Sequence, residues 1–150
     1  GISPFGVWRN ASTDPVKGYS TTAGVQNYDD LYADILLWMD KGWLDYVAPQ
    51  IYWNQGFKAA EYNTLVKWWS KYAADSGTKL YIGQAAYKVN EWQNAKELVN
   101  QINFNRNYAQ VKGSIFFSYK SLLTNPKNVT NSLKNGPYSS VPNENIVGMN

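Results

Sequence analysis

The sequence predicts an α/β fold of four consecutive βα units with parallel strands, which is half of a (β/α)8 TIM-type barrel. Strand-like stretches begin near residues 3, 45, 79 and 113, and a helix-like stretch follows each one. Alternation at this spacing is typical of a parallel sheet with right-handed crossovers. A doubly wound sheet usually carries a glycine-rich phosphate turn after a strand, and none is visible in the chain. Because a complete barrel takes about 250 residues, the 150 residues present suit half of one.

The first unit is the least regular of the four. Residues 2–8 alternate apolar and small side chains, but Pro4 and Gly6 predict a bulged or irregular strand. Residues 11–27 are rich in Ser, Thr, Gly and Asn, which predicts a long loop, and long loops in compact domains are often functional.

A helix is predicted over 29–41, because apolar residues recur there at helical spacing. Asp29 or Asp30 is suited to cap its start, and Gly42 follows its end. Further strands are predicted over 45–52, 79–87 and 113–118, and further helices over 59–74, 94–108 and 126–135. Pro49 predicts a bulge in the second strand because proline cannot donate to the ladder. We expect one domain over 1–136 and a flexible tail over 137–150.

Composition excludes several functional classes. Hydrophobic residues make up 44% and charged residues 17%, as in a globular chain. The net charge is +3 without a basic run, so we expect no nucleic-acid partner. The absence of Cys and His excludes zinc sites built on them, thiol catalysis and His-based triads within this chain. No apolar run is long enough to span a membrane, and we expect no cofactor and no metal.

Aromatic residues make up 16% of the chain, and several stand where predicted strands end. The carboxyl ends of parallel strands carry the chemistry in α/β folds. Amide groups suit sugar hydroxyls, and flat rings suit the apolar face of a pyranose. The predicted substrate-binding residues are Trp8, Arg9, Gln50, Tyr52, Trp53, Gln84, Tyr87, Lys88 and Ser118. The structural alternatives are core packing for the rings, an ion pair for the arginine and strand-end hydrogen bonds for the amides.

Catalytic carboxylates are hard to identify in this chain. Cleavage of a bound glycan would need two, separated by about 5 Å or about 6.5–9.5 Å. Asp14 in the first long loop and Glu91 after the third predicted strand are weak candidates, although Asp14 precedes Pro15 and so suits a turn. No clear pair is present, so we expect the catalytic acids upstream of residue 1. The chain opens at Gly1 without Met and already in strand-like sequence, which suggests a piece of a longer protein.

Five stretches resemble one protein family. They are GISPFGVWRN (1–10), DDLYAD (29–34), GWLDYVAPQIYW (42–53), LYIGQAAYK (80–88) and GSIFFS (113–118). Together they resemble the glycosyl-hydrolase-like family 10 proteins of the bacterial envelope. The resemblance implies the C-terminal half of a (β/α)8 barrel and hydrolysis of glycans, with peptidoglycan strands the favoured substrate. The family's acidic motif, an Asp-Asp followed by Tyr-Phe-Tyr-Pro, has no match here, and Asp29 with Asp30 does not replace it.

The leading hypothesis is therefore a fragment of a glycoside hydrolase that supplies the substrate-binding half of the cleft and is inactive alone. The family resemblance implies an extracytoplasmic location, in the cell envelope or secreted. Two rivals remain, a non-catalytic carbohydrate-binding module and a structural half barrel without a sugar site. A half barrel exposes sheet edges and apolar strand faces, so we expect self-association as a dimer that completes eight strands.

Overall fold

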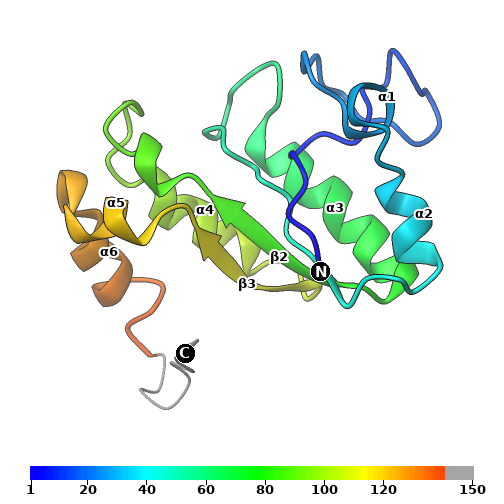
Figure 1. The fold of residues 1–150 in the computed structure, drawn as a ribbon. Coiled ribbons are helices and arrows are strands. Elements are labelled where there is room, and N and C mark those ends of the chain that lie inside the picture. The colour runs from blue at the N-terminus through cyan, green and yellow to red at the C-terminus, as the bar shows by residue number, and fades with distance from the viewer. Residues whose placement is uncertain (141–150) are drawn as a thin grey trace.

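The computed structural model describes residues 1–140 and contains a parallel three-stranded sheet in the order β1-β2-β3, of which β2 and β3 are labelled in Figure 1. The strands are β1 (Tyr46–Val47), β2 (Lys79–Gln84) and β3 (Val111–Phe116). The helices are α1 (Asn27–Leu31), α2 (Ile35–Asp40), α3 (Tyr62–Ser76), α4 (Glu97–Asn105), α5 (Tyr119–Leu123) and α6 (Val129–Asn135), with short 3-10 turns η1 (Ala86–Lys88) and η2 (Pro126–Asn128). The predicted α/β class and the parallel pairing are confirmed.

The first predicted strand forms only isolated bridges. Ile2 pairs in parallel with Val47, and Phe5 pairs in parallel with Gln50. The segment thus runs beside β1 without becoming a regular strand, as expected from a chain interrupted by Pro4 and Gly6. The structure supports a partial βα fold with three strands, and the four complete units and the half barrel stay predictions.

Of the strand predicted over 45–52, only the two residues of β1 form regular strand. Pro49 has no N–H for the ladder, and beyond it only an isolated bridge joins Gln50 to Gly83. The Gly83 N–H still donates to the Pro49 carbonyl at 2.9 Å, so the chain stays beside β2 past the end of the regular strand. The loop after β1 therefore starts close to the carboxyl end of β2.

The single helix predicted over 29–41 is wrong. Tyr32, with φ 54°, ends α1 in the left-handed region, and α2 begins three residues later. The Asp34 side chain accepts from the Leu37 N–H at 3.2 Å and so caps α2. The N-cap position of α1 is held by Gln26 and not by Asp29 or Asp30, but the Asp30 carboxylate accepts from the Gln26 N–H at 2.7 Å and so contributes to the helix start.

Helix α3 is the longest helix of residues 1–140 and joins the first segment to the sheet. The Glu61 carboxylate accepts from the Thr64 N–H at 2.7 Å, which fixes the start three residues later than predicted. Gly77, with φ 72°, ends the helix in the left-handed region that glycine adopts at little cost. The buried Trp69 ring donates through Nε1 to the Gly6 carbonyl at 2.8 Å.

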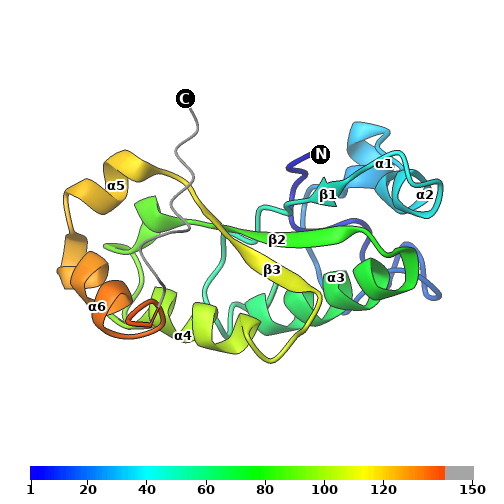
Figure 2. The ribbon, with the colours of Figure 1, turned by 90° about the horizontal axis from the view of Figure 1, so that it is seen from below.

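Helices α3 and α4 lie against one face of the sheet (Figure 2). Val47, Leu80 and Ile82 point into this layer and are fully buried. On the opposite face, Tyr46 is 39% exposed and Ile115 is 46% exposed. Within residues 1–140, β3 pairs only with β2, so its outer edge has no strand partner.

The C-terminal part of the chain follows β3. Helix α5 was not predicted, whereas the predicted helix over 126–135 is present as η2 and α6, with Val129 and Leu133 buried. The Tyr138 ring packs against Phe116 at 6.4 Å between centroids. The rest of the predicted flexible tail, residues 141–150, lies outside the described residues. In the part of the chain that is described, no helix is long and apolar enough to cross a lipid bilayer.

Candidate functional site

The loops that follow the strands meet at the carboxyl edge of the sheet. The segment 51–61 follows β1, η1 and residues 89–96 follow β2, and residues 117–118 follow β3. Each of these loops leads from a parallel strand to the next helix, so all three lie at the same edge (Figure 1). Ligands of parallel α/β sheets bind at this edge.

Three aromatic rings gather there, one from each loop. The Tyr52 ring lies 5.9 Å from Tyr87 and 6.2 Å from Phe117 between centroids, and Tyr87 and Phe117 are 5.9 Å apart. Tyr87 is 44% exposed and Phe117 is 58% exposed. Burial, together with the nearby Tyr87, raises the pKa of the Tyr52 phenol, which stays a neutral hydrogen-bonding group. We call Tyr52, Tyr87 and Phe117 the aromatic cluster.

Phe117 was missed at the sequence level, although strand parity contains the signal. Ile115 pairs with Gly83 on the open face of the sheet, and Phe117 stands two residues further along. By the same rule Gln84 shares the helix-facing side with Leu80 and Ile82. The alternation of side chains along each strand would therefore have placed Phe117 on the open face and Gln84 on the buried face.

A second group of rings borders a neighbouring cavity of about 400 Å³. The Trp53 and Phe57 rings stack with an interplanar angle of 12° and centroids 6.5 Å apart. Trp53 rests on Gly6, where an added Cβ would come within 2.9 Å of the indole. Phe5 and residues 22–25 form the opposite wall. Trp53 is therefore held at an open apolar cavity wide enough to admit a sugar ring, and Phe57 is a second residue that the sequence did not suggest.

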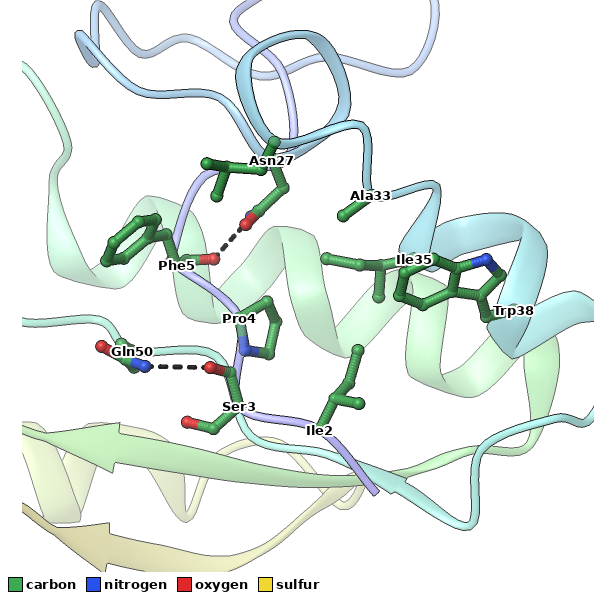
Figure 3. A pocket seen from close by; sticks show the side chains of 10 residues that line it. Ile2, Ser3, Pro4, Phe5, Asn27, Ala33, Ile35, Trp38 and Gln50 are labelled. Atoms are coloured by element: carbon green, nitrogen blue, oxygen red, sulfur yellow. Dashed lines mark hydrogen bonds between the residues drawn. The ribbon is translucent and has the colours of Figure 1, made fainter.

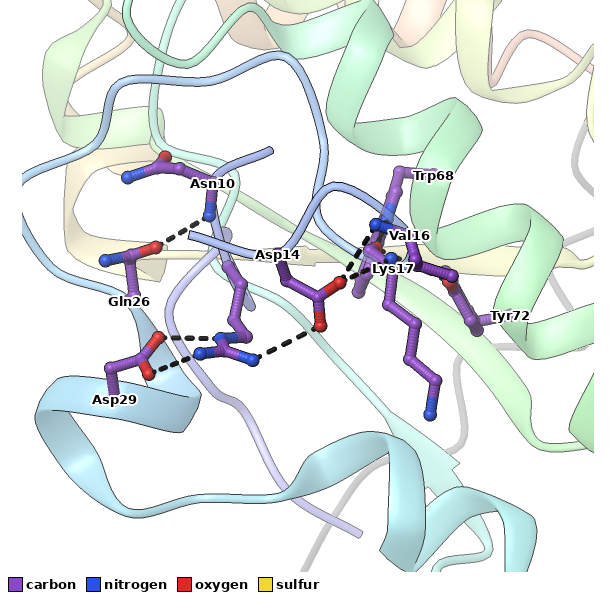
Figure 4. Close-up of polar contacts among 9 residues, drawn as sticks. Asn10, Asp14, Val16, Lys17, Gln26, Asp29, Trp68 and Tyr72 are labelled. Carbon is purple, nitrogen blue, oxygen red and sulfur yellow. Dashed lines mark hydrogen bonds and ion pairs between the residues drawn. The ribbon is translucent and has the colours of Figure 1, made fainter. Parts of the chain in front are cut away.

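Arg9 forms ion pairs with two acids of its own chain, Asp14 and Asp29, both labelled in Figure 4. Its Nε and Nη2 atoms donate to the two Asp29 carboxylate oxygens, both at 2.8 Å. Its Nη1 donates to Asp14 at 3.2 Å, and the guanidinium lies 4.7 Å from the Tyr28 ring centroid. This bidentate geometry is the strong form of the arginine–carboxylate pair. The arrangement matches the ion-pair alternative for Arg9.

Asp14 shapes a turn in the first long loop. Its Oδ1 atom accepts from the N–H groups of Lys17 at 2.9 Å and Val16 at 3.0 Å, while Oδ2 accepts from Arg9. The backbone bond from Lys17, with further help from Val16 and the Arg9 charge, holds the pKa of this carboxyl below its ordinary value. A lowered pKa keeps Asp14 ionised, which opposes a role as general acid. Glu91 lies exposed in the loop before α4.

Two of the predicted residues lie in the protein interior. Trp8 is 3% exposed, with its ring 6.1 Å from Trp68 between centroids. Gln84 is fully buried, and its Nε2 donates to the Tyr62 hydroxyl at 2.7 Å. Their positions match the packing and hydrogen-bonding alternatives.

Gln50, Lys88 and Ser118 lie nearer the carboxyl edge. The Gln50 Nε2 donates to the Ser3 carbonyl at 2.9 Å and so holds the first segment beside the chain after β1 (Figure 3). The Lys88 ammonium lies 5.7 Å from the Tyr87 ring centroid. Ser118 precedes α5, and its hydroxyl lies 3.4 Å from that of Ser121.

The carboxyl edge of the sheet presents aromatic rings, the Lys88 ammonium and hydroxyl groups, all of which can bind a ligand. Among residues 1–140, no group of three or more His, Cys, Asp or Glu side chains is placed to hold a metal ion. Of the predicted site residues, the structure brings Tyr52 and Tyr87 together and sets Trp53 at the adjoining cavity. The edge is therefore a candidate surface for a ligand with flat apolar faces.

Comparison with known proteins adds a family to this geometry. A family model described as glycosyl hydrolase-like 10 matches residues 1–99. Glycosyl hydrolase YngK of Bacillus subtilis (strain 168) is 53% identical over 144 residues, covering 93% of this chain and 28% of that protein. Glycosyl hydrolase DigH of Escherichia coli (strain K12) is 43% identical over 127 residues, covering 78% of this chain and 28% of that protein. The chain thus spans 28% of the length of these curated relatives.

Proposed function

Because this chain belongs to the glycosyl hydrolase-like 10 family, we propose that it forms the substrate-binding part of a glycoside hydrolase that acts on bacterial cell-envelope glycan. Peptidoglycan strands are the substrate we favour. The observation that carries the proposal is the aromatic cluster, in which Tyr52, Tyr87 and Phe117 come from three successive strand ends. Rings exposed in this way stack on the apolar faces of sugars.

The catalytic carboxylates belong, in this proposal, to a part of the longer protein outside the present chain. Asp14 is committed to a turn and to Arg9, which leaves it poorly suited to proton transfer. The described segment alone is then a binding surface that is inactive by itself. Its place of action is outside the cytoplasm, in the envelope or secreted, because the favoured substrate lies there.

The proposed architecture is half of a (β/α)8 barrel. The parallel bridges of Ile2 and Phe5 to the chain beside β1 support a fourth strand position. The sheet carries α3 and α4 on one face and the partly exposed Tyr46 and Ile115 on the other, which suits the inner surface of an incomplete barrel. For the isolated chain we propose a second copy as the partner, paired along the free edge of β3.

A non-catalytic carbohydrate-binding module is the second candidate. The engagement of Asp14 by Arg9 favours it, because such a module needs rings and no free acids. A structural half barrel without a sugar site is less well supported, since Trp53 borders an open cavity and Phe117 is 58% exposed.

The deciding experiment measures binding and cleavage of purified peptidoglycan strands. It compares residues 1–150 with a chain extended upstream by four βα units. We expect binding by both and cleavage by the longer chain only. Binding without cleavage by either would favour the module, and cleavage by 1–150 would return the acids to this segment, with Asp14 and Glu91 the first to mutate. Absence of binding by both would refute the proposal.

A further inference from the structure

A second cavity, of about 490 Å³, opens between the loops that follow β1 and β2, at the carboxyl edge of the sheet. Residues 54–55, which follow β1, form one side of it, and residues 91–94 together with Glu97 form the other. Unlike the cavity at Trp53, its walls carry two carboxylates and several side-chain amides. Its chemistry therefore differs from that of the ring-lined surface.

Glu97 is the unusual member of this wall, because it is only 5% exposed and still lines the cavity. Its Oε1 atom accepts both from the Gln55 N–H at 2.7 Å and from Gln101 Nε2 at 2.8 Å. Within residues 1–140, no donor bonds to its Oε2 atom and no lysine or arginine pairs with it. A nearly buried carboxylate without a cation is costly, so an incoming positive group would gain from the contact.

Glu91 adds a second negative charge to the same cavity from its exposed position. The Lys127 ammonium reaches the loop before α4, where it donates to the Trp92 carbonyl. It therefore binds the backbone and does not pair with Glu91 or Glu97. A divalent metal wants more oxygen ligands than two glutamates supply, and no larger cluster occurs in residues 1–140. An ammonium group, with three N–H donors and one charge, fits two carboxylates and neighbouring amides better.

We propose that this cavity binds the ammonium group of an amino sugar, namely a hexosamine unit that lacks its N-acetyl group. The identity of the ligand rests on the proposed glycan function, since the unit would belong to a chain that also contacts the aromatic cluster. The cavity then gives the binding surface a preference for de-N-acetylated positions along the glycan.

The test uses two probes, the tetramer of N-acetylglucosamine and the same tetramer without its acetyl groups. Their affinities for residues 1–150 are measured by calorimetry in mildly acidic, low-salt buffer, where the amines are charged. We expect the amine-bearing tetramer to bind about tenfold more tightly, and the preference to shrink as salt is added. Glu97→Gln and Glu91→Gln should each remove most of the preference. Asp75→Asn, which removes an exposed charge at the far end of α3, should keep it.

The outcomes separate this inference from the proposed function. If neither tetramer binds, the amine site is refuted, and the glycan function is decided separately by the binding of peptidoglycan strands. If both bind equally well, the glycan function stands and the amine site is refuted. Should Glu97→Gln weaken both tetramers alike, Glu97 only pins the loop after β1, and that result also overturns the proposal. If Glu97→Gln does not fold, Glu91→Gln decides, because Glu91 is exposed and its carboxylate accepts no hydrogen bond from residues 1–140.

Discussion

Replacing Tyr62 with phenylalanine tests whether a buried polar chain ties α3, β2 and α4 together. The fully buried Tyr62 hydroxyl accepts from Gln84 Nε2 at 2.7 Å and donates to Asn105 Oδ1 at 3.0 Å. In Tyr62→Phe the ring packing is kept, but both amide groups lose their partner. Each unsatisfied buried polar group costs about 1–3 kcal/mol, so the loss of two partners should lower the free energy of unfolding by about 2–6 kcal/mol.

A double-mutant cycle with Gln84→Leu isolates the interaction. Gln84→Leu removes the donor and also Gln84 Oε1, which has no partner among residues 1–140. The Tyr62 hydroxyl keeps its bond to Asn105, so this change alone should cost about 1 kcal/mol or less. In the double variant no orphaned Gln84 amide remains. The combined loss should therefore be smaller than the sum of the single losses by about 1–2 kcal/mol.

The assay is urea unfolding followed by tryptophan fluorescence and circular dichroism, with both probes required to coincide. A loss below about 0.5 kcal/mol in Tyr62→Phe, or strictly additive effects, would refute the reasoning. The same Gln84→Leu protein is then tested for glycan binding. Unchanged affinity assigns Gln84 to the interior chain, and a loss of affinity would restore it to the binding surface.

Three further predictions concern the binding surface, the first loop and the sheet. Phe117→Ala and Tyr87→Ala should each weaken binding of peptidoglycan strands about three- to tenfold in calorimetry. Tyr119→Ala, which removes a more exposed ring outside the cluster, should not; equal losses in all three would argue against ring stacking. Because backbone bonds from Lys17 and Val16 lower the pKa of Asp14, its contribution to stability is present above its ordinary pKa of about 3.9 and is lost as the pH falls through the lowered value. Asp14→Asn should flatten the acid limb of the melting temperature, and an unaltered limb would contradict this. In sedimentation, residues 1–150 should behave as a dimer and the Ile115→Lys variant as a monomer. If the unsubstituted chain is itself a monomer, the proposed pairing of two half barrels is refuted.

The order of strands and helices follows from the sequence because the hydrophobic periodicity changes from one element to the next. Helix α3 shows this best, since the predicted inner residues Tyr62, Leu65, Val66 and Trp69 are all buried. The break between α1 and α2 was not predictable in this way. It depends on a left-handed Tyr32 and on the cap by Asp34, and the apolar pattern runs across both without interruption.

Some residues of the candidate site are placed by local sequence pattern, and others by contacts between residues far apart in the sequence. Tyr52 and Trp53 stand at the end of their strand in sequence, so their place at the edge follows from local pattern. The pairing of Arg9 with Asp29 spans 20 residues of sequence, and the contact of Glu97 with Gln55 spans 42. Such contacts form only when the loops fold together, so they cannot be predicted from residue spacing. Glu97 in particular stands in the first turn of α4, a position where acidic residues are common in any helix.

The exposed apolar side chains of this chain could contact either a glycan or a protein partner. Their positions in the fold distinguish these two explanations. Ile115 and Tyr46 lie within strands of the open sheet face, which would become the inside of a barrel completed by a second copy. Phe117 and Tyr87 lie past the strand ends, where loops meet the solvent. If association used the aromatic cluster, glycan strands would compete with the dimer, and Phe117→Ala would loosen both. If the two regions are distinct, Ile115→Lys should abolish the dimer and leave glycan affinity intact. That pair of variants, measured in both assays, decides whether the aromatic cluster is a binding surface or part of a buried interface.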